Sequence, residues 1–177
     1  MTEKASLSEF KSARFEKKVK MIFQKSYDNF EKEVLVQGKK SNKPHKVDLH
    51  AWKFKGLFES VRIDTWVKLS RKKVSKNIIE NLHESIEDVR EAKKARMIDW
   101  SPDNVFIASS EGFDSEALKL AKKYKIYCMR VFEDGFEFVG EMKPVSRWNI
   151  LFNQILFFIA SIIAVLILIY LVNLFLA

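Results

Sequence analysis

Hydrophobic and polar positions change their spacing along the first 140 residues, which predicts helices alternating with strands. Near the N-terminus, four apolar residues recur at three- and four-residue spacing and predict a helix over 7–27: Phe15, Val19, Ile22 and Phe23. Ser6 would be the N-cap of this helix, and Glu9 would complete a capping box. A longer helix is predicted over 75–96 from a stripe of six residues: Ile78, Ile79, Leu82, Ile86, Val89 and Ala92.

Alternation between these two helices predicts strands over 31–38, 46–54 and 60–69, with turn residues between the first two. The alternation of the second strand breaks at its end, where Lys53 falls on the apolar side and Phe54 on the polar side. Because side chains alternate along a strand, each of the last two strands should have an apolar and a polar face. The apolar faces would carry Val47, Leu49, Ala51, Val61, Ile63, Thr65 and Val67. The polar faces would carry Asp48, His50, Trp52, Arg62, Asp64, Trp66 and Lys68.

The remaining elements follow the break at Pro102. A nearly continuous apolar run over 104–110 predicts a strand covered on both faces. Asp114 is a good N-cap for a helix over 115–125. A buried strand over 126–132 and a short edge strand over 136–140 complete the set. This order favours an α/β fold with a mixed central sheet flanked by helices.

The C-terminal segment has a different character. Arg147 carries the last charge, and 150–177 is apolar all round and long enough to cross a bilayer. We expect a cytoplasmic domain over 1–142, a basic juxtamembrane linker over 143–149 and a transmembrane tail anchor over 150–177. Lys143 and Arg147 flank the anchor and predict that the N-terminal domain faces the cytoplasm.

Composition then narrows the partners. The formal net charge of +8 lies entirely on residues 1–147, which favours nucleic acid or anionic lipid headgroups. The single cysteine, Cys128, lies in an apolar run and cannot form an internal disulfide. We expect it to be a buried structural thiol.

The candidate chemistry lies on the two polar strand faces, at Asp48, Asp64, Trp66 and Lys68. Metal-assisted cleavage of a phosphodiester uses carboxylates on neighbouring strands, with a lysine nearby. Asp48 and Asp64 would hold Mg²⁺ through oxygen ligands, and Lys68 would orient the nucleophile or stabilise charge.

At these residues the sequence resembles the restriction-endonuclease-like superfamily, in particular its Mrr-type branch, whose core pattern is Asp followed by Glu-x-Lys or Gln-x-Lys. The resemblance covers 15–132 and implies that family's fold. The segment HKVDLHAWK places the acidic metal ligand at Asp48, and VKLSRKKVSKNII places the family lysine at Lys68. RFEKKVKMIF carries Glu16 where the family often has an early Glu, and SSEGFDSEALKLAKKYKI resembles the later strand–helix–strand segment.

One departure from the family pattern concerns Trp66, which stands at the Glu or Gln position. An indole cannot coordinate Mg²⁺. Asp64, two residues earlier on the same face, could replace the ligand from a displaced position. However, two strand residues span about 6–7 Å, whereas oxygen–metal distances are about 2 Å. The substitution therefore predicts that cleavage is weakened or lost.

Two basic clusters should flank the same open face, where nucleic acid would bind through phosphates. They are Lys39, Lys40, Lys43 and Lys46 in the first, and Arg71, Lys72, Lys73 and Lys76 in the second. Anionic lipid is the alternative ligand for these side chains.

Three functions are consistent with the sequence. The first is nucleic-acid association at a membrane, with DNA as the expected partner and cleavage lost or carried by an altered site of Asp48, Asp64 and Lys68. The resemblance adds Glu16 to the candidate catalytic residues. The second is an active, Mg²⁺-dependent DNA endonuclease. The third is a non-enzymatic scaffold that binds an unknown protein.

Overall fold

The computed structural model describes residues 2–55, 61–140, 158, 159 and 161–163. The chain divides into two compact units, Met1–Lys143 and Pro144–Ala177. The few described residues of the second unit are helical. No helix within the described residues is both long and apolar enough to cross a membrane. The expected tail anchor over 150–177 lies almost entirely outside them and stays a prediction.

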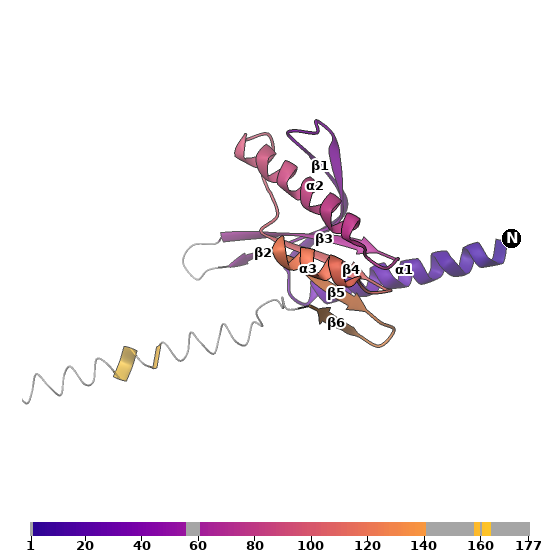
Figure 1. The fold of residues 1–177 in the computed structure, drawn as a ribbon. Coiled ribbons are helices and arrows are strands. Elements are labelled where there is room, and N and C mark those ends of the chain that lie inside the picture. Colours follow the sequence, from indigo (N-terminus) through magenta and orange to yellow (C-terminus); the bar gives the residue numbers. More distant parts are fainter. Residues whose placement is uncertain (1, 56–60, 141–157, 160, 164–177) are drawn as a thin grey trace, which may run out of the picture. The chain divides into compact units, whose positions relative to one another are not determined.

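The first unit is a six-stranded mixed sheet with helices on both faces (Figure 1). This confirms the predicted α/β class and its mixed sheet. The elements, in chain order, are α1 (Thr2–Gln24), β1 (Asn29–Gln37), β2 (Pro44–Lys55), β3 (Val61–Ser70), α2 (Lys76–Lys94), β4 (Asn104–Ser109), α3 (Ser115–Lys123), β5 (Ile126–Val131) and β6 (Phe136–Val139).

The strands lie in the sheet in the same order as in the sequence. β1, β2 and β3 form an antiparallel meander. β3, β4 and β5 are parallel, and α2 and α3 are their crossovers. β6 pairs antiparallel with β5 at the edge, as predicted. Parallel neighbours need a crossover element, so α2 and α3 must pack back onto the sheet.

Two apolar clusters hold these layers together. The α1-side cluster contains Phe15, Val19, Phe23, Leu49, Ala51, Val67, Phe106 and Met129. The α2-side cluster contains Val47, Trp66, Ile79, Ile86, Val89, Ile107, Ala117 and Cys128. Strands between two such clusters are buried on both faces, which confirms the prediction made for 104–110.

The predicted open polar face on the second and third strands is wrong for His50, Asp64 and Trp66, which are all buried. The other polar residues of this face, Asp48, Trp52, Arg62 and Lys68, are half-buried or exposed. The alternation of apolar and polar residues in this segment is typical of an antiparallel sheet with one solvent-exposed face. β3 also pairs in parallel with β4, and the crossover α2 covers the face expected to be open.

Helix ends differ in part from expectation. α1 begins at Thr2 and so runs through Ser6, which is not its N-cap. Asp114 does occupy the N-cap position of α3, but its carboxylate pairs with the Lys73 ammonium at 2.8 Å. α2 ends in a Schellman motif in which Arg96 has a left-handed backbone, with φ of 59°. The amide of Met97 donates to the Ala92 carbonyl at 3.0 Å.

Cys128 lies in the α2-side cluster with 2% of its surface exposed. Burial raises the pKa of its thiol to about 12, because the thiolate would lose its hydration. The prediction of a buried structural thiol is confirmed.

Candidate functional site

Asp48 and Lys68 meet where the pairing between β2 and β3 ends. The last paired residues are Leu49 and Val67, one position before this point. The Asp48 carboxylate lies 3.0 Å from the Lys68 ammonium. It also accepts a hydrogen bond of 2.8 Å from the Leu69 amide. The predicted convergence of an acid and an amine on neighbouring strands is therefore present.

A backbone irregularity in β1 coincides with Asp48. The register between β1 and β2 is regular except for the missing rung between Glu33 and Asp48. Glu33 has φ of 53°, a left-handed conformation that is uncommon for a residue with a side chain. Val47 packs in the α2-side cluster and Leu49 in the α1-side cluster, although strict alternation would place both on one face. β2 thus changes face at Asp48.

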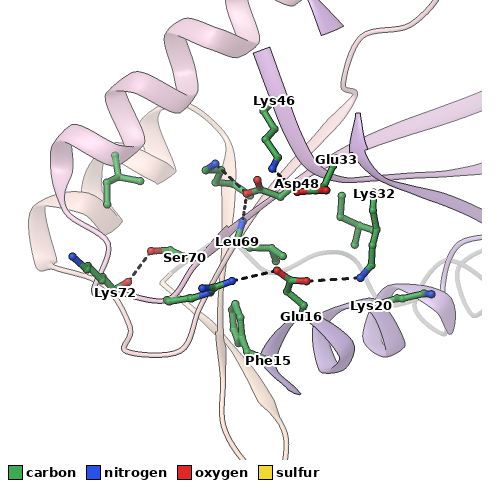
Figure 2. A pocket seen from close by; sticks show the side chains of 14 residues that line it. Phe15, Glu16, Lys20, Lys32, Glu33, Lys46, Asp48, Leu69, Ser70 and Lys72 are labelled. Carbon is green, nitrogen blue, oxygen red and sulfur yellow. Dashed lines mark hydrogen bonds and ion pairs between the residues drawn. The ribbon is translucent and has the colours of Figure 1, made fainter. Parts of the chain in front are cut away.

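The Asp48 cleft opens at this point and has a volume of about 600 Å³ (Figure 2). Its walls are α1, β1, β2, β3, the loop between β3 and α2, and Ile78 in the first turn of α2. Six basic side chains line it, namely Lys20, Lys32, Lys46, Lys68, Arg71 and Lys72. Three carboxylates also line it, from Glu16, Glu33 and Asp48, so the cleft has a surplus of three positive charges.

Each carboxylate of the Asp48 cleft has a basic partner. Glu16 lies between two cations, with its oxygens 3.5 Å from the Arg71 guanidinium and 3.8 Å from the Lys32 ammonium (Figure 2). Glu33 pairs with Lys46. Their contact lowers the pKa of Glu33 and raises the pKa of Lys46, so both groups are charged at neutral pH.

Asp64 does not reach the Asp48 cleft. Its carboxylate accepts hydrogen bonds from the His50 ring at 2.8 Å and from Arg62 at 2.9 Å, and it is 3% exposed. Four residues along β3 separate it from Lys68, which is about 13 Å in a strand. Asp64 therefore does not lie where it could replace the missing metal ligand beside Asp48 and Lys68.

Trp66 also lies away from the cleft. It is 1% exposed and packs in the α2-side cluster. Its Cα partner on β2 is His50, whose ring stacks on Trp100 with centroids 3.7 Å apart. The indole at position 66, where the sequence resemblance implies an acid, thus fills the core between β3 and α2.

A divalent metal does not fit the groups around Asp48. The nearest polar partners of its carboxylate are an ammonium and an amide N–H, both of which are donors. Within the described residues, no group of three or more His, Cys, Asp or Glu side chains is placed to hold an ion. The predicted pair of Mg²⁺ ligands is divided, since Asp48 lines the cleft and Asp64 is buried in a hydrogen bond with His50.

The second basic cluster lies partly in the Asp48 cleft. Arg71 and Lys72 line it, and Lys72 has no carboxylate partner among the described residues. Lys73 pairs with Asp114 at 2.8 Å, and Lys76 pairs with Glu80 at 3.5 Å. Both pairs lie at helix N-termini, and none of these four residues lines the cleft.

The first basic cluster divides in two. Lys46 lines the Asp48 cleft, whereas Lys39, Lys40 and Lys43 lie in the turn between β1 and β2 and do not line it. The Lys40 ammonium pairs with Glu91 of α2 at 2.6 Å. The prediction that all four lysines flank one face is therefore correct only for Lys46.

Asp88 of α2 holds this turn in place. Its carboxylate accepts the amides of Lys40 and Ser41 at 2.5 and 3.2 Å and contacts the His45 ring at 2.8 Å. Burial alone would raise the pKa of Asp88, but these hydrogen bonds outweigh it and keep the pKa well below its usual range. A Cβ atom at Gly38 would lie 2.0 Å from the Asp88 carboxylate, so only glycine fits there.

Three charged residues of the Asp48 cleft were not predicted from the sequence: Lys20, Lys32 and Glu33. Lys20 follows Glu16 by four residues in a helix, and this spacing places both side chains on one face. That spacing could have identified Lys20. No local signal indicates Lys32 and Glu33, because their positions depend on the irregular backbone at Glu33.

Comparisons with known proteins identify no family for this chain. No family model matches the chain, and no curated protein matches it. One solved structure, titled "Crystal Structure of Protein of Unknown Function AF1548", is similar with 15% identity and a TM-score of 0.47. The match covers 62% of this chain and 52% of that chain, so this chain spans about half the length of its structural neighbour.

Proposed function

We propose that the first unit is a restriction-endonuclease-like domain of the Mrr type that binds nucleic acid through its phosphates in the Asp48 cleft. The segment over 150–177 anchors it to a membrane, with the domain in the cytoplasm. One observation carries the proposal: six basic side chains surround the Asp48–Lys68 pair and exceed the carboxylates by three. DNA is the expected partner.

Electrostatics supports binding that is independent of sequence. Lysine and arginine side chains that neutralise phosphates release condensed counterions, and this gives affinity without reading bases. The basic side chains come from α1, β1, β2, β3 and the following loop, so they surround the cleft on several sides. Basic side chains spread over several elements suit a chain of phosphates better than a single small anion.

The same residues support the proposal that cleavage activity is lost. The Asp48 carboxylate is neutralised by Lys68, and Asp64 is committed to His50 and Arg62. The residue at the family's second acidic position, Trp66, is buried in the core. We therefore place this protein among binding modules that kept the nuclease fold.

Salt-dependent binding tests this function. The full chain is titrated with labelled DNA and RNA between about 50 and 200 mM salt. A triple variant, Lys46→Gln, Arg71→Gln and Lys72→Gln, removes charge from the Asp48 cleft. A control triple variant, Lys25→Gln, Lys94→Gln and Lys119→Gln, removes the same charge from exposed residues outside it.

The cleft variant should reduce the slope of log affinity against log salt by about 0.7–0.9 for each lost phosphate contact. The control variant should keep the wild-type slope. Equal reductions in both variants would show that binding follows net charge and not the cleft. Absence of salt-dependent binding to either nucleic acid at low salt would overturn the proposal and favour a scaffold.

Cleavage is measured with the same protein. Supercoiled plasmid is incubated with the wild-type chain and Mg²⁺ or Mn²⁺. The plasmid should remain intact. Cutting that is abolished by both Asp48→Ala and Lys68→Ala would instead establish an active endonuclease.

A further inference from the structure

Glu16 holds an unusual place among the carboxylates of the Asp48 cleft. Asp48 and Glu33 each pair with one cation, whereas Glu16 contacts two, Lys32 and Arg71. These cations come from different elements, β1 and the loop after β3. Glu16 itself comes from α1 and lies between them (Figure 2).

We propose that Glu16 is an internal competitor for phosphate: it occupies Lys32 and Arg71, and a phosphodiester of the ligand can bind these cations only where it displaces the Glu16 carboxylate. The inference rests on the proposed function, and it adds that Glu16 lowers the affinity of the cleft for nucleic acid. Glu16 thereby determines how many cations the ligand engages.

The chemistry of the two groups is closely matched. A carboxylate and a phosphodiester each carry one negative charge and present two oxygens, and arginine binds either in a bidentate manner. A phosphodiester can therefore take the place of Glu16 between Lys32 and Arg71. Glu16 is tethered to α1, whose Phe15 and Val19 are packed in the α1-side cluster, so its reach toward both cations is fixed.

The distances show that the contacts are weak enough to be displaced. Charge-assisted hydrogen bonds have lengths of about 2.7–2.9 Å, whereas the Glu16 contacts are 3.5 and 3.8 Å. The side chains are also exposed to water, with 39% of Glu16 and 63% of Arg71 accessible. Exposed ion pairs of this kind contribute little to stability.

A single substitution, Glu16→Gln, tests the inference in the full chain. It keeps the side-chain volume and removes the charge that competes with phosphate. Glu87→Gln is the matched control, because Glu87 pairs with Arg90 at 2.8 Å on α2, outside the Asp48 cleft. Both variants gain one unit of net charge and release one arginine.

Glu16→Gln should strengthen binding to nucleic acid and make its salt dependence steeper. Two additional phosphate contacts would increase the slope by about 1.4 for single strands and 1.8 for duplexes. The ratio of variant to wild-type affinity should accordingly fall by roughly tenfold between about 50 and 200 mM salt. Adding Arg71→Gln should remove about half of the gain. Glu87→Gln should bind like the wild type.

The outcomes separate this inference from the proposed function. If wild-type binding depends on salt but Glu16→Gln binds no better than Glu87→Gln, the competitor role is wrong and the function stands. Weaker binding by Glu16→Gln, with an unchanged melting temperature, would instead make Glu16 a supporting ligand and overturn the inference. If neither wild type nor variant binds, the proposed function itself has failed.

Discussion

Replacing Trp66 with glutamate would place an acid where the Mrr-type motif that the sequence resembles has one, and the structure indicates that this change unfolds the domain instead. The indole is 1% exposed and packs in the α2-side cluster. A buried Trp removes about 150–250 Å² from water, which corresponds to roughly 4–6 kcal/mol at about 25 cal/mol per Å². Glutamate would recover only part of this through its methylene groups.

Burial of the new carboxylate adds to this loss. Without a hydrogen-bond partner, a buried polar group costs about 1–3 kcal/mol, and a charge costs more. Among the described residues, even the Trp66 indole N–H has no partner, so the site offers little to an acid. The combined loss of about 5–8 kcal/mol is comparable with the total stability of an ordinary domain, about 5–15 kcal/mol.

The assay is urea unfolding of residues 1–143, a compact unit, followed by far-ultraviolet circular dichroism. Trp66→Phe is the control, because it keeps an aromatic ring and breaks no hydrogen bond; it should lose about 1–2 kcal/mol. A Trp66→Glu domain within about 1 kcal/mol of wild type would refute the core packing of the indole. Gained Mg²⁺-dependent cleavage by that folded variant would place residue 66 at the catalytic site.

Three further predictions concern stability and reactivity. Burial lowers the pKa of His50 despite its hydrogen bond to Asp64, so as the pH falls the unfolded chain takes up a proton at a higher pH than the folded chain does. The melting temperature should therefore fall as the pH drops below about 6.5, and His50→Gln should reduce this pH dependence. Arg96→Gly removes the cost of a left-handed side chain and should raise the free energy of unfolding by up to about 1 kcal/mol in urea titrations, whereas Arg96→Val should lower it. Cys128 should resist alkylation in the native chain and react once urea unfolds it; rapid native labelling would contradict its burial.

The pairing of Asp48 with Lys68 could be predicted from the sequence because it depends only on an antiparallel hairpin. Once two consecutive strands are recognised, alternation and register bring these side chains together. The α/β class follows from the same local patterns. These properties need no knowledge of how distant segments pack.

The positions of Asp64 and Trp66 could not be obtained in this way. Their burial depends on β4, which pairs with β3 from some forty residues later and brings α2 over that face. A polar residue on an alternating strand indicates solvent only if nothing covers it. The Asp64 carboxylate is hydrogen-bonded inside the fold by His50 and Arg62, and its sequence pattern is the same as that of an exposed acid.

The hold of Asp88 on the turn after β1 has a consequence for evolution. A Cβ atom at Gly38 would lie 2.0 Å from the Asp88 carboxylate and 2.7 Å from the His45 ring, which are hydrogen-bonded to each other, so Gly38 cannot enlarge while both side chains keep their places. A relative with a larger residue at position 38 should therefore also have lost the acid at position 88. Joint variation at these distant positions would reveal in an alignment which family members have released the turn from its helix.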